Sequence, residues 1–177
     1  MATDFLRILL NRMNLLEADH LVIVSIDAIP KEVQMDICHN LADKHPYFVQ
    51  NNLTWEDAKD SLLGGIVDPV RVKMGVMPVE TIYGTMHHHH SEAVVLKYQR
   101  MLEINPLFEF DPILVSYGKF YDGGHRLKAY HRAGRLMIPV VEAGHILEAS
   151  NESWEEWFDG YDHTTETVRP SSVFSLS

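Results

Sequence analysis

The sequence predicts an α/β fold, and three observations support this prediction. Apolar runs rich in β-branched residues are typical of strands and occur at residues 21–26, 70–74, 77–83, 113–115, 120–121 and 137–141. Apolar residues at helical spacing predict helices over residues 4–16, 31–44, 55–63, 91–104, 125–133 and 153–158. The third observation is the order of strand, glycine pair, helix and strand between residues 111 and 142.

The first third of the chain is expected to be helix-rich. An amphipathic opening helix is followed by a strand at residues 21–26, which we expect to be buried. His45 and Pro46 would end the second helix, because the residue before a proline is biased away from the helical conformation. Asn52 or Thr54 is suited to cap the third helix.

Gly64-Gly65 and Asp68-Pro69 interrupt both kinds of pattern. They fit a helix C-cap followed by a turn, and they also fit a boundary between subdomains. The predicted organisation is, in order, a helix-rich extension or subdomain, a central domain, an acidic aromatic cap and a flexible tail, at residues 1–69, 70–146, 147–163 and 164–177.

The central domain contains the most informative stretch. A strand at residues 113–115, a turn and a short return strand lead to Asp122 and a glycine pair, and a helical pattern then continues to Gly134, which is suited to end it. The following strand contains Pro139. Because proline lacks a backbone N–H, this residue favours an edge position or a strand start.

Gly123 and Gly124 suggest a binding site at the start of that helix. Without Cβ atoms, backbone N–H groups can approach a ligand closely, and the positive end of a helix attracts an anion. A phosphate group is the expected ligand, flanked by His125 and by Arg126, whose guanidinium matches phosphate oxygens. The alternatives are a tight turn without a ligand, a surface salt bridge for Arg126, and a capping or packed role for His125.

At these residues the chain resembles the ParB/sulfiredoxin-like family of nucleotide-binding domains. The residues that carry the resemblance are DGGHR at 122–126, Ala129 and the IPVV strand at 138–141, and it covers about residues 76–146. It implies a small mixed sheet with helices. It also implies a bound nucleotide, ATP or another NTP, together with Mg²⁺.

Departures from the family narrow these implications. Sulfiredoxins carry a cysteine immediately before the His-Arg pair, where this chain has Gly124, so reduction of cysteine sulfinic acid is not expected. ParB proteins carry Glu-Arg-Arg in place of Gly124-His125-Arg126. The free-serine kinases of the family have a similar turn, but their catalytic acid has no clear counterpart here. The resemblance therefore implies a site for the phosphate of a nucleotide, but it implies no specific reaction.

Two functions remain. The first is a Mg²⁺-dependent ATPase or phosphotransferase, in which Gly123, Gly124, His125 and Arg126 hold the nucleotide and Asp122 and His125 are the catalytic candidates. Asp122 would repel a phosphate unless it binds Mg²⁺, caps the helix or acts as a base. The second is a non-enzymatic module that binds a nucleotide as a switch, or only retains the fold, and contacts a protein partner through its acidic C-terminal segment. DNA binding or nuclease activity is less favoured, because the flanking segments are acidic.

His87, His88, His89 and His90 form an uninterrupted histidine run before the helix at residues 91–104. Imidazoles bind transition metals, but successive side chains of an extended segment point in opposite directions, so a run is poorly arranged for a tetrahedral site. We expect a solvated loop, with metal binding as the alternative. If this loop faces the nucleotide, one of the histidines would touch its phosphate.

Charge and composition set the remaining expectations. The chain has 177 residues and a net charge of −10, yet residues 70–135 hold 9 basic and 6 acidic side chains while both flanks are acidic. The only net-positive segment therefore contains the predicted phosphate site. No apolar run is long enough to cross a membrane, no signal peptide is recognisable, and the single cysteine cannot form an internal disulfide. A cytoplasmic location is expected.

Overall fold

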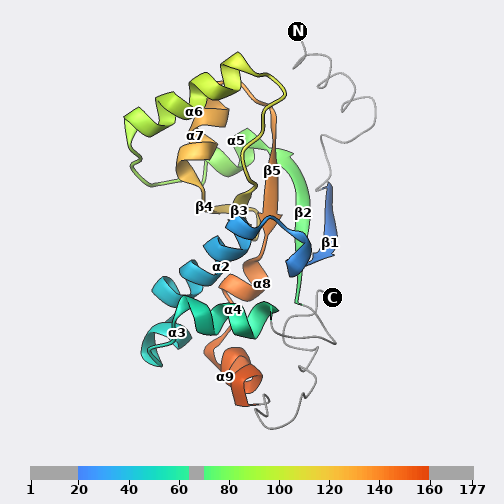
Figure 1. The fold of residues 1–177 in the computed structure, drawn as a ribbon, viewed down its shortest axis with the longest axis vertical. Helices are drawn as coiled ribbons and strands as arrows, with labels where there is room; N and C mark the ends of the chain where they lie inside the picture. Colours follow the sequence, from blue (N-terminus) through green and yellow to red (C-terminus); the bar gives the residue numbers. More distant parts are fainter. Residues whose placement is uncertain (1–19, 64–69, 160–177) are drawn as a thin grey trace. The chain divides into compact units, whose positions relative to one another are not determined.

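The computed structural model of the protein describes residues 20–63 and 70–159 (Figure 1). Within these ranges it confirms the α/β fold, with a five-stranded mixed sheet in the order β1-β2-β5-β3-β4. The strands are β1 (His20–Ser25), β2 (Arg71–Pro78), β3 (Ile113–Ser116), β4 (Lys119–Asp122) and β5 (Met137–Glu142). The helical segments are η1 (Ile26–Ala28), α2 (Lys31–Lys44), α3 (Pro46–Gln50), α4 (Trp55–Leu63), α5 (Val79–Tyr83), α6 (Glu92–Ile104), α7 (Gly124–Arg132), α8 (Gly144–Leu147) and α9 (Asn151–Asp159).

Several predicted features lie outside the described residues, namely the helix at 4–16, the Gly64-Gly65 and Asp68-Pro69 breaks and the tail at 164–177. None of the helices in the described ranges is both long and apolar enough to cross a membrane.

Helix ends that carry a capping signal were predicted well. α2 and α4 have the predicted bounds, and Thr54 caps α4. Its Oγ1 accepts the Asp57 N–H at 3.3 Å, while Asp57 Oδ2 accepts the Thr54 N–H at 2.7 Å. α3 was missed, because Pro46 was interpreted only as a stop. Proline is also well suited to the first turn of a helix, and it opens α3 directly after α2.

The predicted strand at residues 77–83 is wrong beyond Pro78. β2 continues to Pro78, and the β-branched run that follows forms α5. Val79 and Ile82 are three residues apart and both are buried, so a helix places them on the same side against the core. Tertiary contacts therefore override the strand propensity of this run.

The edge position predicted from Pro139 is also wrong. β5 lies inside the sheet, between β2 and β3. Its parallel pairing with β3 matches Ile113 with Val140, Leu114 with Val141 and Val115 with Glu142, so this register begins just after the proline. One missing N–H next to a paired segment is compatible with an inner strand, although such positions are uncommon.

β1 is less buried than predicted. The strand is at the edge of the sheet, and the exposed fractions of Val22 and Ile23 are 62% and 51%. An apolar run predicted the strand itself, but burial also depends on neighbours that the run does not reveal.

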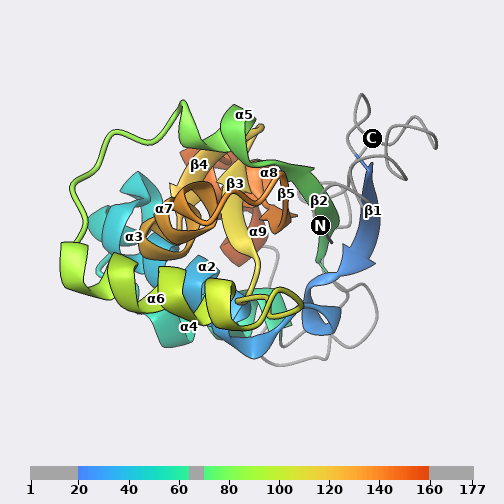
Figure 2. The ribbon, with the colours of Figure 1, turned by 90° about the horizontal axis from the view of Figure 1, so that it is seen from above.

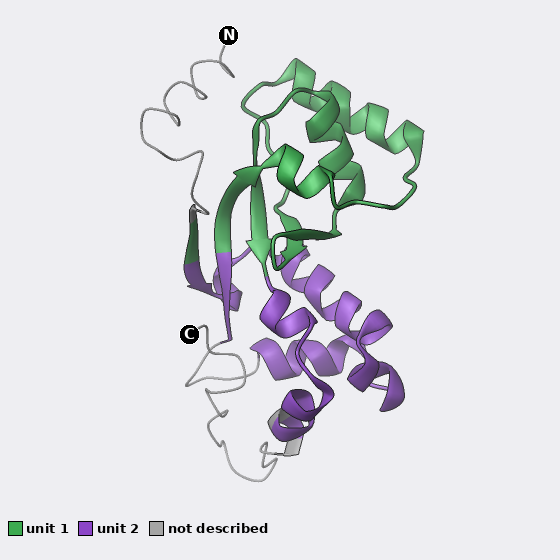
Figure 3. Cartoon of the chain, turned by 180° about the vertical axis from the view of Figure 1, so that it is seen from behind, with its two compact units in different colours: residues 1–22, 74–142 green, residues 23–73, 143–177 purple. Residues whose placement is uncertain are grey.

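The chain forms two compact units, shown in different colours in Figure 3. Unit 1 contains residues 1–22 and 74–142, and unit 2 contains residues 23–73 and 143–177. Most of the predicted central domain is in unit 1. The predicted N-terminal extension and the acidic cap fall mainly in unit 2. The boundaries between the two units lie within β1, within β2 and directly after β5.

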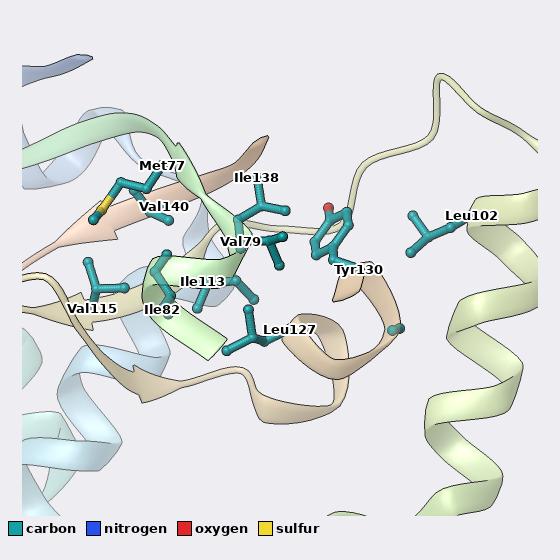
Figure 4. Packing of buried hydrophobic residues seen from close by; sticks show 11 residues of the cluster. Met77, Val79, Ile82, Leu102, Ile113, Val115, Leu127, Tyr130, Ile138 and Val140 are labelled. Carbon is teal, nitrogen blue, oxygen red and sulfur yellow. The ribbon is translucent and has the colours of Figure 1, made fainter. Parts of the chain in front are cut away.

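Unit 1 has its own hydrophobic core (Figure 4). It is formed by Met77, Val79, Ile82, Leu102, Ile113, Val115, Leu127, Ala129, Tyr130, Ile138 and Val140. These residues come from β2, α5, α6, β3, α7 and β5, and α6 runs alongside α7 in two views (Figures 1 and 2). Tyr130 also accepts the Phe110 N–H at 2.7 Å, and burial raises the pKa of its phenol to about 12. Its hydroxyl therefore has a structural role in this core.

Unit 2 is closed by an aromatic cluster in which Trp154 of α9 is fully buried. The ring centroids of Trp154 and Phe48 are 4.9 Å apart in an edge-to-face arrangement. Trp154 therefore belongs to the buried core of unit 2, and the side chain of Trp157 lies outside the described residues. The N-cap of α9 is Ser150, whose Oγ accepts the Ser153 N–H at 3.1 Å.

The tight turn between β3 and β4 uses an unusual residue. Tyr117 and Gly118 have positive φ angles, 49° and 77°. Glu142 holds the turn, because its carboxylate oxygens accept the Tyr117 and Gly118 N–H groups at 2.8 and 2.9 Å. Two positive φ angles are typical of hairpin turns that favour Asn-Gly.

We expect Tyr117→Asn to stabilise unit 1 by up to about 1 kcal/mol, since asparagine tolerates the left-handed conformation better and this tyrosine is 64% exposed. Hydrogen exchange of the β3 and β4 amides measures the effect. Tyr117→Ala is the matched control, because it removes the ring but keeps the backbone strain. Equal stability of the two variants would contradict the explanation.

His45 connects the start of α3 to the segment between α8 and α9 in unit 2. Its Nε2–H donates to the Ala149 carbonyl at 2.7 Å, and its Nδ1 accepts the Tyr47 N–H at 3.2 Å. These bonds require a neutral ring with the proton on Nε2. Burial lowers the pKa of His45, although the bond to Ala149 acts in the opposite direction.

A folded-state pKa below the usual 6.5 means that the unfolded chain binds the extra proton more readily. The contribution of His45 to stability is therefore complete above pH 6.5 and is lost as the pH falls towards the lower, folded-state pKa. We expect His45→Asn, which keeps an acceptor near Tyr47, to cost about 1–3 kcal/mol at pH 7.5 and clearly less at pH 5. Urea unfolding followed by tryptophan fluorescence checks this, because all three tryptophans belong to unit 2. A difference that does not change with pH would contradict the lowered pKa of His45 in the folded state.

Candidate functional site

The predicted site residues come together at the junction of β4 and α7 in unit 1. β4 ends at Asp122, Gly123 occupies the N-cap position, and α7 begins at Gly124. Both glycines are buried, whereas Asp122, His125 and Arg126 are half-buried. Gly123, His125 and Arg126 each make a hydrogen bond to another residue of the chain.

Gly123 is required by both conformation and space. Its φ of 99° is in the left-handed region, and a Cβ atom here would lie 2.8 Å from Arg126 Nη2 and 3.1 Å from Ile113 Cδ1. Its N–H donates to Asp122 Oδ1 at 2.7 Å. This amide, predicted to face a phosphate, therefore already has an intramolecular acceptor.

Gly124 leaves room for a side chain from another segment. A Cβ atom on this residue would lie 1.7 Å from Nε2, 2.3 Å from Cε1 and 2.6 Å from Cδ2 of His90. The imidazole of His90 thus fills the volume that any other residue would need for its side chain. We predicted that a ligand would lie close to the backbone at this glycine. In the structure the ring of His90 lies there.

His125 joins α7 to the start of α6. Its Nε2 accepts the N–H of Ser91, the N-cap residue of α6, at 3.2 Å. A ring that accepts through Nε2 is neutral and carries its proton on Nδ1. The rings of His125 and His90 meet edge to face with centroids 5.0 Å apart. These contacts agree with the capping and packed role that we considered for His125.

Arg126 ties α7 to the segment that leads into β3. Its Nη1 donates to the carbonyl oxygens of Asp111 and Pro112 at 3.0 and 3.2 Å. These backbone bonds differ from both earlier interpretations, a phosphate contact and a surface salt bridge. A charged donor bound to two carbonyls holds the first turn of α7 beside the strand.

An acidic residue missed by the sequence analysis lies on α6. Glu92 accepts two hydrogen bonds from Arg132, one of them at 3.1 Å, and its carboxylate lies 3.7 Å from Lys128 Nζ. The hydrogen bond with Arg132 lowers the pKa of Glu92 and raises the pKa of Arg132. Part of the positive charge along α7 is thereby neutralised. No signal in the sequence pairs these residues, which are 40 positions apart.

The histidine run forms a loop, as predicted, in which His87, His88 and His89 are exposed and His90 is turned inward. The residues that the structure describes contain no group of three or more His, Cys, Asp or Glu side chains arranged to hold a metal ion.

The single cysteine, Cys38, is buried in unit 2, and burial raises its pKa to about 12. A thiol in this state is a poor nucleophile.

Comparison of the chain with known protein families, with curated proteins and with solved structures found no match.

We expect Arg126→Ala to destabilise unit 1 by about 1.5–3 kcal/mol in buffer without phosphate or nucleotide, because two carbonyls lose a charged donor. Calorimetric unfolding measures the change. Arg100→Ala is the control, since Arg100 is an exposed arginine on α6. If both variants unfolded like the parent, the bonds to Asp111 and Pro112 would not contribute to stability.

Proposed function

We propose that the first turn of α7 binds the phosphate of a nucleotide. The supporting observation is the helix start itself: the N-cap residue is Gly123, which has no side chain with which to accept the first-turn N–H groups of α7. An anion is a suitable acceptor at that position, where the helix dipole adds a positive partial charge. The resemblance to ParB/sulfiredoxin-like domains adds the nucleotide.

The contacts within the chain refine which groups would bind. The Gly123 amide is engaged with Asp122, so the N–H groups of Gly124 and His125 are better placed as donors. Lys128 is one turn further along α7 and adds positive charge that Glu92 partly offsets. Arg126 would contribute positive charge beside the first turn of α7 while its Nη1 stays bonded to the carbonyl oxygens of Asp111 and Pro112.

Mg²⁺ and turnover are secondary parts of the proposal. Mg²⁺ is often held by one or two carboxylates together with the substrate phosphates, and Asp122 is the carboxylate nearest in sequence to the glycine pair. Asp122 thus fits a nucleotide that brings its own metal ion. In an ATPase or phosphotransferase, Asp122 would also orient the attacking group, and His125 would exchange a proton with it.

A second candidate function is binding of a protein partner through the acidic C-terminal segment of unit 2. The observation in its favour is that Glu152, Glu155 and Glu156 of α9 are exposed while Trp154 is buried. A surface with these side chains would favour a basic partner and would act through charge. This function does not require turnover of a nucleotide.

Thermal unfolding with ATP, ADP, CTP and GTP, each with and without Mg²⁺, tests the first proposal. A ligand present at a hundred times its dissociation constant stabilises the folded state by about 2.7 kcal/mol. We expect a shift with at least one nucleotide and a larger shift with Mg²⁺. No shift with any of them would reject nucleotide binding and favour the second function.

The position of the site is tested by calorimetric titration of the effective nucleotide. We expect Arg126→Ala to weaken binding by at least about tenfold, equal to about 1.4 kcal/mol, and Arg100→Ala to leave it unchanged. The titration is run at a temperature at which circular dichroism shows both variants folded, so that loss of fold is separated from loss of binding. Unchanged affinity in Arg126→Ala would place the nucleotide elsewhere.

A further inference from the structure

The loop at residues 85–91 is fastened at both ends to the elements that form the candidate site. At one end, Thr85 Oγ1 accepts the Phe120 N–H of β4 at 2.9 Å and donates to the Ile82 carbonyl at 2.7 Å. At the other end, the Ser91 N–H donates to His125 Nε2 of α7 at 3.2 Å. The histidine run therefore spans the β4–α7 junction between two fixed points.

His90 is the histidine of this run that is turned inward. Its ring contacts the Gly124 backbone where a Cβ would otherwise be, and it meets the rings of His125 and Phe120 edge to face, with centroid distances of 5.0 and 6.4 Å. Its Nδ1 is shielded from solvent and makes no hydrogen bond of acceptable geometry. The ring is thus held mainly by contact, and the free energy lost by burying Nδ1 without a partner is recovered when the ring moves into solvent.

We propose that His90 is a removable plug that closes the first turn of α7, so that a phosphate-bearing ligand must displace it to reach the backbone amides. This regulatory device rests on the function proposed above. It gives Gly124 a definite role, because a side chain at that position would keep the plug open. The plug also gives a reason why His90 is partly buried while His87, His88 and His89 in the same loop are exposed.

The charges around His90 favour a neutral plug. Burial lowers the pKa of its ring, and His125 and Lys128 on α7 and His88 in the loop act in the same direction, while the backbone of His88 opposes them. A protonated ring would also face the positive end of α7. Above the usual pKa of 6.5 the plug is therefore uncharged, and acid favours its release.

A double-mutant cycle tests whether the plug exists. In His90→Ala, we expect the exchange of the Gly124 and His125 amides, normalised for intrinsic rates and measured by NMR, to rise about fivefold to tenfold. Gly124→Ala should give a similar rise, because it expels His90, and the double variant should rise no further. His89→Ala, in the exposed part of the same loop, is the control that should change nothing. Additive effects, or an unchanged His90→Ala, would overturn the plug.

Titration with inorganic phosphate and with ATP plus Mg²⁺ tests what the plug controls. We expect His90→Ala to bind more tightly than the parent, by the factor by which its amide exchange increases. Equal or weaker binding in His90→Ala overturns the plug as a regulator and leaves the nucleotide site in place. If the cycle shows coupling but neither ligand binds any variant, the proposed function fails, the contact is purely structural, and regulation fails with it.

Discussion

The absence of two Cβ atoms at the β4–α7 junction is the constraint on which the candidate site depends. At Gly123 it permits a left-handed backbone and the close position of the Arg126 guanidinium. At Gly124 it permits the His90 ring to lie against the main chain. Because Gly123 accommodates Arg126 and Gly124 accommodates His90, the segment that leads into β3, the histidine loop and the first turn of α7 are connected through one tight turn.

A glycine pair before a helix is commonly interpreted as room for a ligand. In this chain the same room is filled by Arg126 on one side and by His90 on the other. The physical requirement, close approach to the backbone, is identical in the two cases, so the motif alone does not distinguish them. What distinguishes them is how strongly each occupant is held. Arg126 makes two hydrogen bonds to carbonyl oxygens, whereas His90 is held mainly by ring contacts.

The sequence was sufficient where a local rule determines the outcome. α2 and α6 begin and end beside capping residues or prolines, α4 begins at its capping residue, and the hairpin of β3 and β4 follows from two short apolar runs on either side of the turn at Gly118. The assignment failed at Val79–Tyr83, where β-branched residues form a helix because Val79 and Ile82 face one core. It also failed at Pro139, because the number of neighbours of a strand is not encoded in the strand itself.

Within the site, the residue types were predictable but their partners were not. The sequence singled out Asp122, the glycines, His125 and Arg126 as one turn, and the structure keeps them together at the start of α7. The bond from Ser91 to His125 spans 34 positions, and that from Arg126 to the Asp111 carbonyl spans 15. Such contacts depend on how α6 and α7 lie side by side, which no local pattern specifies. His90 could not be separated from its neighbours in the run for the same reason.

These internal contacts also determine how a nucleotide would have to bind. A ligand that needs an open site binds with its intrinsic affinity reduced by the fraction of molecules that are open. Every 1.4 kcal/mol that favours the closed state weakens apparent binding about tenfold. The bonds of Arg126 stabilise the turn itself and can persist while a ligand binds, whereas the ring of His90 lies directly against Gly124 and cannot. Affinity at this site should therefore depend on the loop that carries His90 as well as on the residues of the glycine turn, because the contact of His90 with Gly124 must be lost before a nucleotide reaches the backbone.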